Sequence, residues 1–167
     1  MAEKLKITKP KGGSSTGAAA LNKQFAAAPR TEKPIENMSG ELMKIEDTIQ
    51  TQCALMAQLP DSHHIGVGGK PLPTDKQQQV QDELNAARKR SEEVLSGLTS
   101  SEKENLPGVL GKIEETIQKL SSLLAGLPQS NHIGIGGKHV PTFAGLVIGG
   151  ELDCAAQRAA QIKQILG

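Results

Sequence analysis

The sequence predicts an all-α protein made of two tandem αα-hairpins with glycine-rich loops, preceded by an extended N-terminal arm. Three observations predict this fold class: an internal repeat, apolar residues at helical spacing within the repeat, and very few aromatic side chains. The 167-residue chain is 1% aromatic and has no Trp or Tyr, so it lacks the large side chains that usually anchor an enzyme core. A deep, aromatic-lined pocket is therefore not expected.

The body of the chain repeats itself at an offset of 68 residues. Over residues 44–74, 19 of 31 positions are identical to those 68 residues further on, which does not arise by chance. We expect one hairpin in residues 37–98 and a second in residues 106–167, joined by a connector over residues 99–105. Serine and threonine followed by glutamate in the connector predict a short helical turn there.

The first helix of each hairpin carries apolar residues at alternating steps of three and four. The stripes are Met38, Leu42, Ile45, Ile49, Met56 and Leu59, with Gln52 as a polar break, and Leu106, Leu110, Ile113, Ile117, Leu120, Leu124 and Leu127. Such stripes are typical of a bundle seam, with Lys, Glu, Gln and Ser expected on the outer faces. Pro60 and Pro128 are expected to end these helices.

The returning helices have weaker stripes that contain small residues, which favour close helix approach. These stripes are Val80, Leu84, Ala87, Ser91, Val94 and Leu98, and Ile148, Leu152, Ala155, Ala159, Ile162 and Leu166. Thr74 and Gln77 fit a capping box at the first of these helices. The glycines after Thr142 predict a late start for the second. Two arrangements satisfy the pattern, a four-helix bundle and two splayed hairpins that each complete a core against a partner.

Residues 1–36 form a basic arm of low complexity, rich in Gly, Ala and Ser and without a sustained apolar period. Such a segment is not expected to fold alone. We expect it to contact a partner through seven basic side chains, Lys4, Lys6, Lys9, Lys11, Lys23, Arg30 and Lys33. An acidic protein surface is the favoured partner of the arm, and nucleic-acid phosphates are the alternative.

The loops at 63–74 and 131–142 are the most nearly identical parts of the repeat, although loops usually diverge most. Their shared candidate residues are His64, Gly66, Gly68, Gly69 and Lys70, and His132, Gly134, Gly136, Gly137 and Lys138. The glycines permit positive φ angles, and the alternating apolar residues between them suit a short extended segment. We interpret both loops as compact turns whose short extended segments could pair with each other, with the loop of the other repeat, or with the sheet edge of a partner. The last option makes the loops docking elements, with the two histidines capping or bracing the turn.

The same ten loop residues also suit a loose anion site, because glycine amides and a lysine can converge on a phosphate. They do not match the Walker A motif, since histidine replaces its first glycine and no Ser or Thr follows the lysine. A metal site would use His63, His64, His132 and His139, but only His64 and His132 occur in both copies and Asp61 is the single nearby carboxylate. No Ser, His and Asp pattern and no carboxylate pair accompanies the histidines. No metal, no cofactor and no enzymatic activity are therefore expected. Cys53 and Cys154 are expected to be small buried side chains.

These observations predict a non-enzymatic structural or assembly protein that inserts helical hairpins between other protein subunits and drapes its arm over neighbours. A minor virion component, such as a capsid cement, neck or tail protein, is a setting that uses such parts, by analogy. The alternatives are a nucleic-acid-associated protein and an anion-binding protein, and self-association is a further option. The chain shows no signal-peptide core and no membrane span, so a soluble, intracellular protein without a membrane partner is expected.

Overall fold

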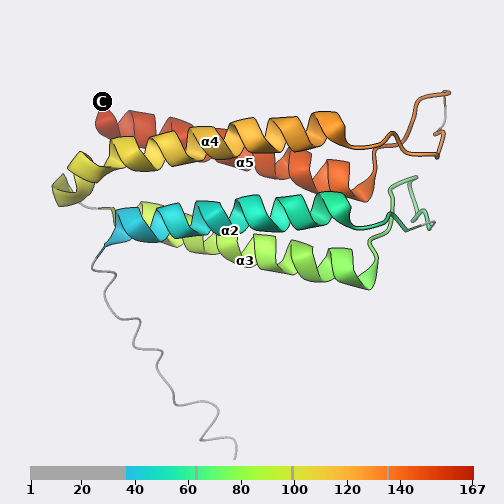
Figure 1. Ribbon diagram of the computed structural model, residues 1–167, viewed down its shortest axis with the longest axis horizontal. Helices are drawn as coiled ribbons and strands as arrows, with labels where there is room; N and C mark the ends of the chain where they lie inside the picture. The colour runs from blue at the N-terminus through green and yellow to red at the C-terminus, as the bar shows by residue number, and fades with distance from the viewer. Residues whose placement is uncertain (1–36, 63, 99, 135) are drawn as a thin grey trace, which may run out of the picture. The chain divides into compact units, whose positions relative to one another are not determined.

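The computed structural model describes residues 37–62, 64–98, 100–134 and 136–167, which belong to one compact unit (Figure 1). Its elements are α2 (Met38–Gln58), α3 (Asp75–Gly97), the 3-10 helix η1 (Ser100–Asn105), α4 (Leu106–Gly126) and α5 (Phe143–Leu166). The described ranges contain no β-strand beyond two isolated bridges, so the prediction of an all-α fold is confirmed. None of the helices in these ranges combines the length and the apolar character needed to cross a lipid bilayer.

The helices alternate in direction, so that α2 and α4 run parallel and both long loops lie at one end (Figure 1). The 3-10 helix η1 lies at the opposite end. Helix α2 packs against α3 and α4, α4 packs against α5, and α2 also contacts α5 over a shorter stretch. The buried apolar residues of the four helices form one continuous core.

The helix starts are fixed by side chains that satisfy free backbone amides. The side chain of Thr74 accepts a hydrogen bond from the amide of Gln77, whose side chain accepts one from the amide of Thr74, as the capping box predicted. The hydroxyl of Thr142 accepts a hydrogen bond from the amide of Gly145 at 3.0 Å. Helix α5 therefore begins at Phe143, and the prediction of a late start was wrong. Burial of Phe143 and its neighbours in the core outweighs the low helix propensity of the glycines that follow.

The buried face of α3 follows the predicted stripe from Val80 to Val94. In α2, the wholly buried Cys53 continues the stripe in place of Gln52, so the expected polar break lies outside the core. In α4, Thr116 is buried and Ile117 lies only at the margin of the core. The expectation that Glu and Gln lie on the outer faces of the first helices fails in α2, where Glu46 and Gln50 are buried. In α5, Glu151 is buried as well.

Candidate functional site

The loop between α2 and α3 folds back on itself as a small hairpin, which we call the first tip (residues 64–72). The amide of Gly66 donates to the carbonyl oxygen of Lys70 at 2.8 Å, and the amide of Leu72 donates to that of His64 at 3.0 Å. These bonds involve only backbone atoms. The first tip is therefore braced by the backbone of His64, and the prediction that its side chain would brace the turn is not needed to explain the structure.

The loop between α4 and α5 forms a second tip (residues 132–140) with the same hydrogen bonds in the same register. The amide of Gly134 donates to the carbonyl oxygen of Lys138 at 2.8 Å, and the amide of Val140 donates to that of His132 at 2.9 Å. Each tip also has one isolated antiparallel bridge at the matching pair of residues. The two loops therefore have one backbone design.

The glycines of the tips have two separate roles. Gly68 and Gly69 have φ angles of 91° and 75°, a left-handed backbone that glycine adopts without strain. Gly136 and Gly137 repeat these values at 92° and 76°. At Gly66 a Cβ atom would lie 3.0 Å from the side chain of Leu72, so this glycine permits a close approach across the hairpin. Gly134 does the same against Val140, at 3.1 Å.

Apolar side chains on the tips are left in solvent. Val67 at the apex of the first tip is fully exposed, and Ile133 of the second tip is 67% exposed. Ile65 and Leu72 are each exposed by more than two fifths. Exposed apolar side chains gathered at one end of a molecule commonly mark an interaction site.

The charged side chains of the tips are all basic. Lys70 and Lys138 are exposed, and within the described ranges neither belongs to an ion pair. His64 is exposed and His132 is partly buried, while the Nδ1 atom of His139 lies 2.9 Å from the carbonyl oxygen of Ser130. No Asp or Glu occurs between residues 62 and 74 or between residues 129 and 150. The tips therefore present apolar side chains, histidines and two lysines, and no carboxylate.

The backbone of the tips is less suited to a phosphate than the sequence suggested. The amides of Gly66, Gly69, Gly134 and Gly137 all donate to carbonyl oxygens within their own tips, so they are not free to converge on an anion. The following helices begin several residues after each lysine, at Asp75 and Phe143. Among the residues that the structure describes, no group of three His, Cys, Asp or Glu side chains is placed to hold a metal ion.

The seven basic arm residues, Lys4, Lys6, Lys9, Lys11, Lys23, Arg30 and Lys33, lie outside the described residues. The arm contact therefore stays a prediction.

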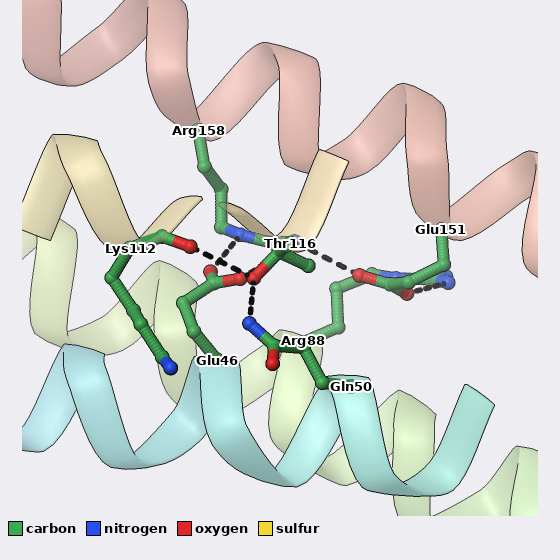
Figure 2. A network of polar contacts seen from close by, with 7 residues as sticks. All are labelled: Glu46, Gln50, Arg88, Lys112, Thr116, Glu151 and Arg158. Atoms are coloured by element: carbon green, nitrogen blue, oxygen red, sulfur yellow. Dashed lines mark hydrogen bonds and ion pairs between the residues drawn. The ribbon is translucent and has the colours of Figure 1, made fainter. Parts of the chain in front are cut away.

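A buried network of charges joins α2, α3 and α5, and sequence reasoning missed it (Figure 2). Arg158 is 4% exposed and binds Glu46 with two nitrogens, at 2.7 and 3.2 Å. Its third contact is with Glu151, at 3.0 Å, and Glu151 also accepts two hydrogen bonds from Arg88. Two carboxylates and two guanidinium groups thus alternate, and the buried charges are compensated.

The sequence held one signal for this network. Glu151 and Arg158 are seven residues apart and so share a helix face, which also carries the buried Ala155 and Ile162. A carboxylate and a guanidinium on an otherwise apolar face indicate a buried pair. Glu46 gives no comparable signal, because Glu114 occurs in the same seven-residue stretch with one change, at 112–118.

A second polar group connects α2 to α4 beside the charges (Figure 2). The side-chain amide of Gln50 donates to the hydroxyl oxygen of Thr116 at 2.9 Å, and that hydroxyl donates to the carbonyl oxygen of Lys112. The oxygen of Gln50 accepts a hydrogen bond from Lys119 at 2.7 Å. Each polar atom of Gln50 is therefore satisfied, which the burial of this amide requires.

Burial and the charges of the network shift the pKa values of Cys53 and Arg158. Burial raises the pKa of the Cys53 thiol to about 12, and the charge of Glu151 adds to the effect. Burial alone would lower the pKa of Arg158, but the charge of Glu46 and the hydrogen bonds to both carboxylates outweigh burial and raise it. Arg158 therefore stays charged inside the core. The raised pKa of Cys53 keeps its thiol protonated and unreactive.

No protein-family model, no curated protein and no solved structure matches the chain.

Proposed function

We propose that the protein is a non-enzymatic assembly protein that docks into a larger complex through its two tips. The observation that carries this proposal is the pair of hairpins with one backbone design, both at the same end of the helical unit (Figure 1). Among the described residues of the tips, the side chains are exposed or half-buried and none belongs to the buried helical core. Their lysines and apolar residues are therefore free to contact a partner.

The tips are suited to binding because their shape is set before a partner arrives. Cross-hairpin hydrogen bonds and the glycine conformations hold each backbone, so little chain entropy is lost on docking. Two equivalent tips on one chain also allow bivalent attachment, in which the second contact forms at high effective concentration. This combination favours a stable position within an assembly.

The tandem duplication of the hairpins is part of this proposal. It is supported by the sequence identity at an offset of 68 residues and by the matching hydrogen bonds of the two tips. The basic arm supplies further contacts to neighbouring subunits in this account. A minor virion component, such as a capsid cement, neck or tail protein, is the setting that we propose for such an assembly role.

A photo-crosslinking amino acid at Val67 tests the proposal in cells or particles that contain the full chain. We expect a discrete adduct that mass spectrometry resolves into a tip residue joined to a defined partner. The matched control carries the same group at Lys89, which is exposed on α3 and distant from the tips. Absence of a discrete adduct at Val67, or the same adducts at both positions, would contradict docking through the tips.

A further inference from the structure

We infer that the tips bind the opposite end of a second copy of this chain, so that copies associate head to tail. The inference rests on the proposed function, because it assumes that the tips are docking elements. It adds the identity of the acceptor. Three observations carry it: the charge of the tips, the position of the carboxylates and the contents of the surface hollows.

The charges of the helical unit are divided between its parts. The tips contain Lys70 and Lys138 and no carboxylate. Outside the tips, residues 37–167 contain ten Lys or Arg side chains and 15 Asp or Glu side chains. A second copy therefore presents a surface of opposite net charge to the tips, which favours their encounter.

Two hollows toward the end that bears η1 combine a carboxylate with an apolar side chain. One hollow, of about 350 Å³, lies between the starts of α2 and α4 and includes Met43 and Glu104. The other, of about 310 Å³, lies between the last turns of α3 and α5 and includes Glu92 and Leu95. Among the described residues, neither Glu92 nor Glu104 has an ion-pair partner. Each hollow therefore offers a free carboxylate to a lysine and an apolar wall to a tip.

Two other hollows do not fit the tips. The hollow between the middle parts of α2 and α4 contains Lys119 and no carboxylate. The hollow between the start of α5 and the facing part of α3 contains Arg88 and no carboxylate. Neither offers a carboxylate to the lysines of an incoming tip, and the cation in each is already paired, Lys119 with Glu115 and Arg88 with Glu151. Charge complementarity thus selects the hollows remote from the tips.

This contact joins two different surfaces, so it is heterologous. It leaves one pair of tips and one acceptor end free in every dimer, and further copies can add in the same way. The expected product is an open chain that grows with concentration. A self-limiting dimer is not expected.

Sedimentation velocity of the purified full chain tests the inference. The mean mass of the wild type should rise with concentration at about 50 mM salt. At about 0.5 M salt, association should weaken by about tenfold or more, because salt screens exposed charges. The double variants Lys70→Glu/Lys138→Glu and Glu92→Lys/Glu104→Lys should each stay monomeric, with unchanged helicity in circular dichroism since all four residues are exposed.

Mixing the two double variants is the decisive test. The glutamates on the tips of one variant complement the lysines in the hollows of the other. The mixture should therefore associate, and its mean mass should rise with concentration as that of the wild type does. The single reversal Lys89→Glu, on the outer face of α3, is the control for a charge reversal outside the tips and should associate as the wild type does.

Several results would overturn the inference. A wild type that stays monomeric at every concentration, or a mixture that stays monomeric, excludes the head-to-tail contact. Loss of association in Glu92→Lys/Glu104→Lys but not in Lys70→Glu/Lys138→Glu would show that another segment occupies the hollows. A Val67 adduct with a different protein, together with a monomeric wild type, would retain the proposed function and remove only self-association.

Discussion

A stretch of seven residues occurs twice with one change, at 44–50 in α2 and at 112–118 in α4, yet the two copies face different surroundings. Glu46 is 1% exposed and binds Arg158 in the core. Its counterpart Glu114 has half of its side chain exposed and pairs at the surface, with a lysine 3.1 Å away. The same sequence therefore gives one glutamate inside the core and one outside.

The returning helices show the same division. Glu151 is wholly buried, whereas its counterpart Glu83 lies at the surface and accepts a hydrogen bond from Gln52. Arg158 is buried, whereas its counterpart Arg90 is one-third exposed beside surface carboxylates. The buried network thus takes one member from each of three repeat pairs.

The tips behave differently from the helices, since both copies keep the same backbone hydrogen bonds and neither contributes a side chain to the buried core. A tip depends on backbone bonds within about nine residues, which the sequence determines locally. The burial of a helix face depends on its neighbours. Helix α2 contacts three other α-helices and η1, whereas α4 contacts α2, α5 and η1. Position in the bundle therefore decides whether a side chain is buried, even where the two copies have the same sequence.

The largest effect is expected from removing Arg158. The substitution Arg158→Met leaves the buried Glu46 without its ion-pair partner and removes one of the two partners of Glu151, so it should lower the free energy of unfolding by about 3–5 kcal/mol. Arg90→Met, at the repeat counterpart, should cost about 1 kcal/mol or less, because exposed ion pairs contribute little. Urea unfolding followed by circular dichroism measures the free energy of unfolding of both variants. Equal losses would contradict the claim that Arg158 is buried in the core and Arg90 is not.

Substitution of Glu46 should also lower the free energy of unfolding more than substitution of its counterpart Glu114, with a smaller difference than for the arginines. Glu46→Gln keeps the shape of the side chain but removes the charge that compensates Arg158, so we expect a loss of about 1.5–3 kcal/mol. Glu114→Gln should change the free energy of unfolding by no more than about 0.5 kcal/mol. A larger loss at Glu114 than at Glu46 would show that the other glutamate is the buried one.

Alkaline pH should sharpen the comparison at Cys53, whose counterpart Ser121 is exposed. The folded pKa of Cys53 is about 12 and the ordinary value is 9.0, so only the unfolded chain loses this proton between pH 9 and 12. The free energy of unfolding should therefore fall with rising pH, by about 1.4 kcal/mol per unit from this group. Cys53→Ala should remove that slope, and an unchanged slope would contradict the burial of the thiol.

The threonine pair should show the smallest difference. Thr116→Val removes the hydroxyl that accepts a hydrogen bond from buried Gln50, and it should cost about 1 kcal/mol. Thr48→Val, at the exposed counterpart, should lie within about 0.5 kcal/mol of the wild type. Both values come from thermal unfolding of matched samples, and a larger loss for Thr48→Val would reverse the assignment of inner and outer faces.

Sequence reasoning reached the helices because apolar spacing, prolines and the Thr74 capping box are local signals. It also anticipated positive φ angles in the loops, which Gly68 and Gly136 adopt. It missed the burial of Glu46, and it had to, since Glu114 sits in nearly the same sequence at the surface. The late start predicted for α5 failed for a related reason, because tertiary burial of Phe143 outweighed the glycines.

A double-mutant cycle tests the central claim most directly. Combining Glu46→Gln with Arg158→Met should cost much less than the sum of the single changes, with a coupling energy of about 2 kcal/mol or more. The cycle that combines Glu114→Gln with Arg90→Met should be additive within about 0.5 kcal/mol. Equal coupling in both cycles, or coupling only in the second, would contradict the account that one member of each repeat pair forms the buried network.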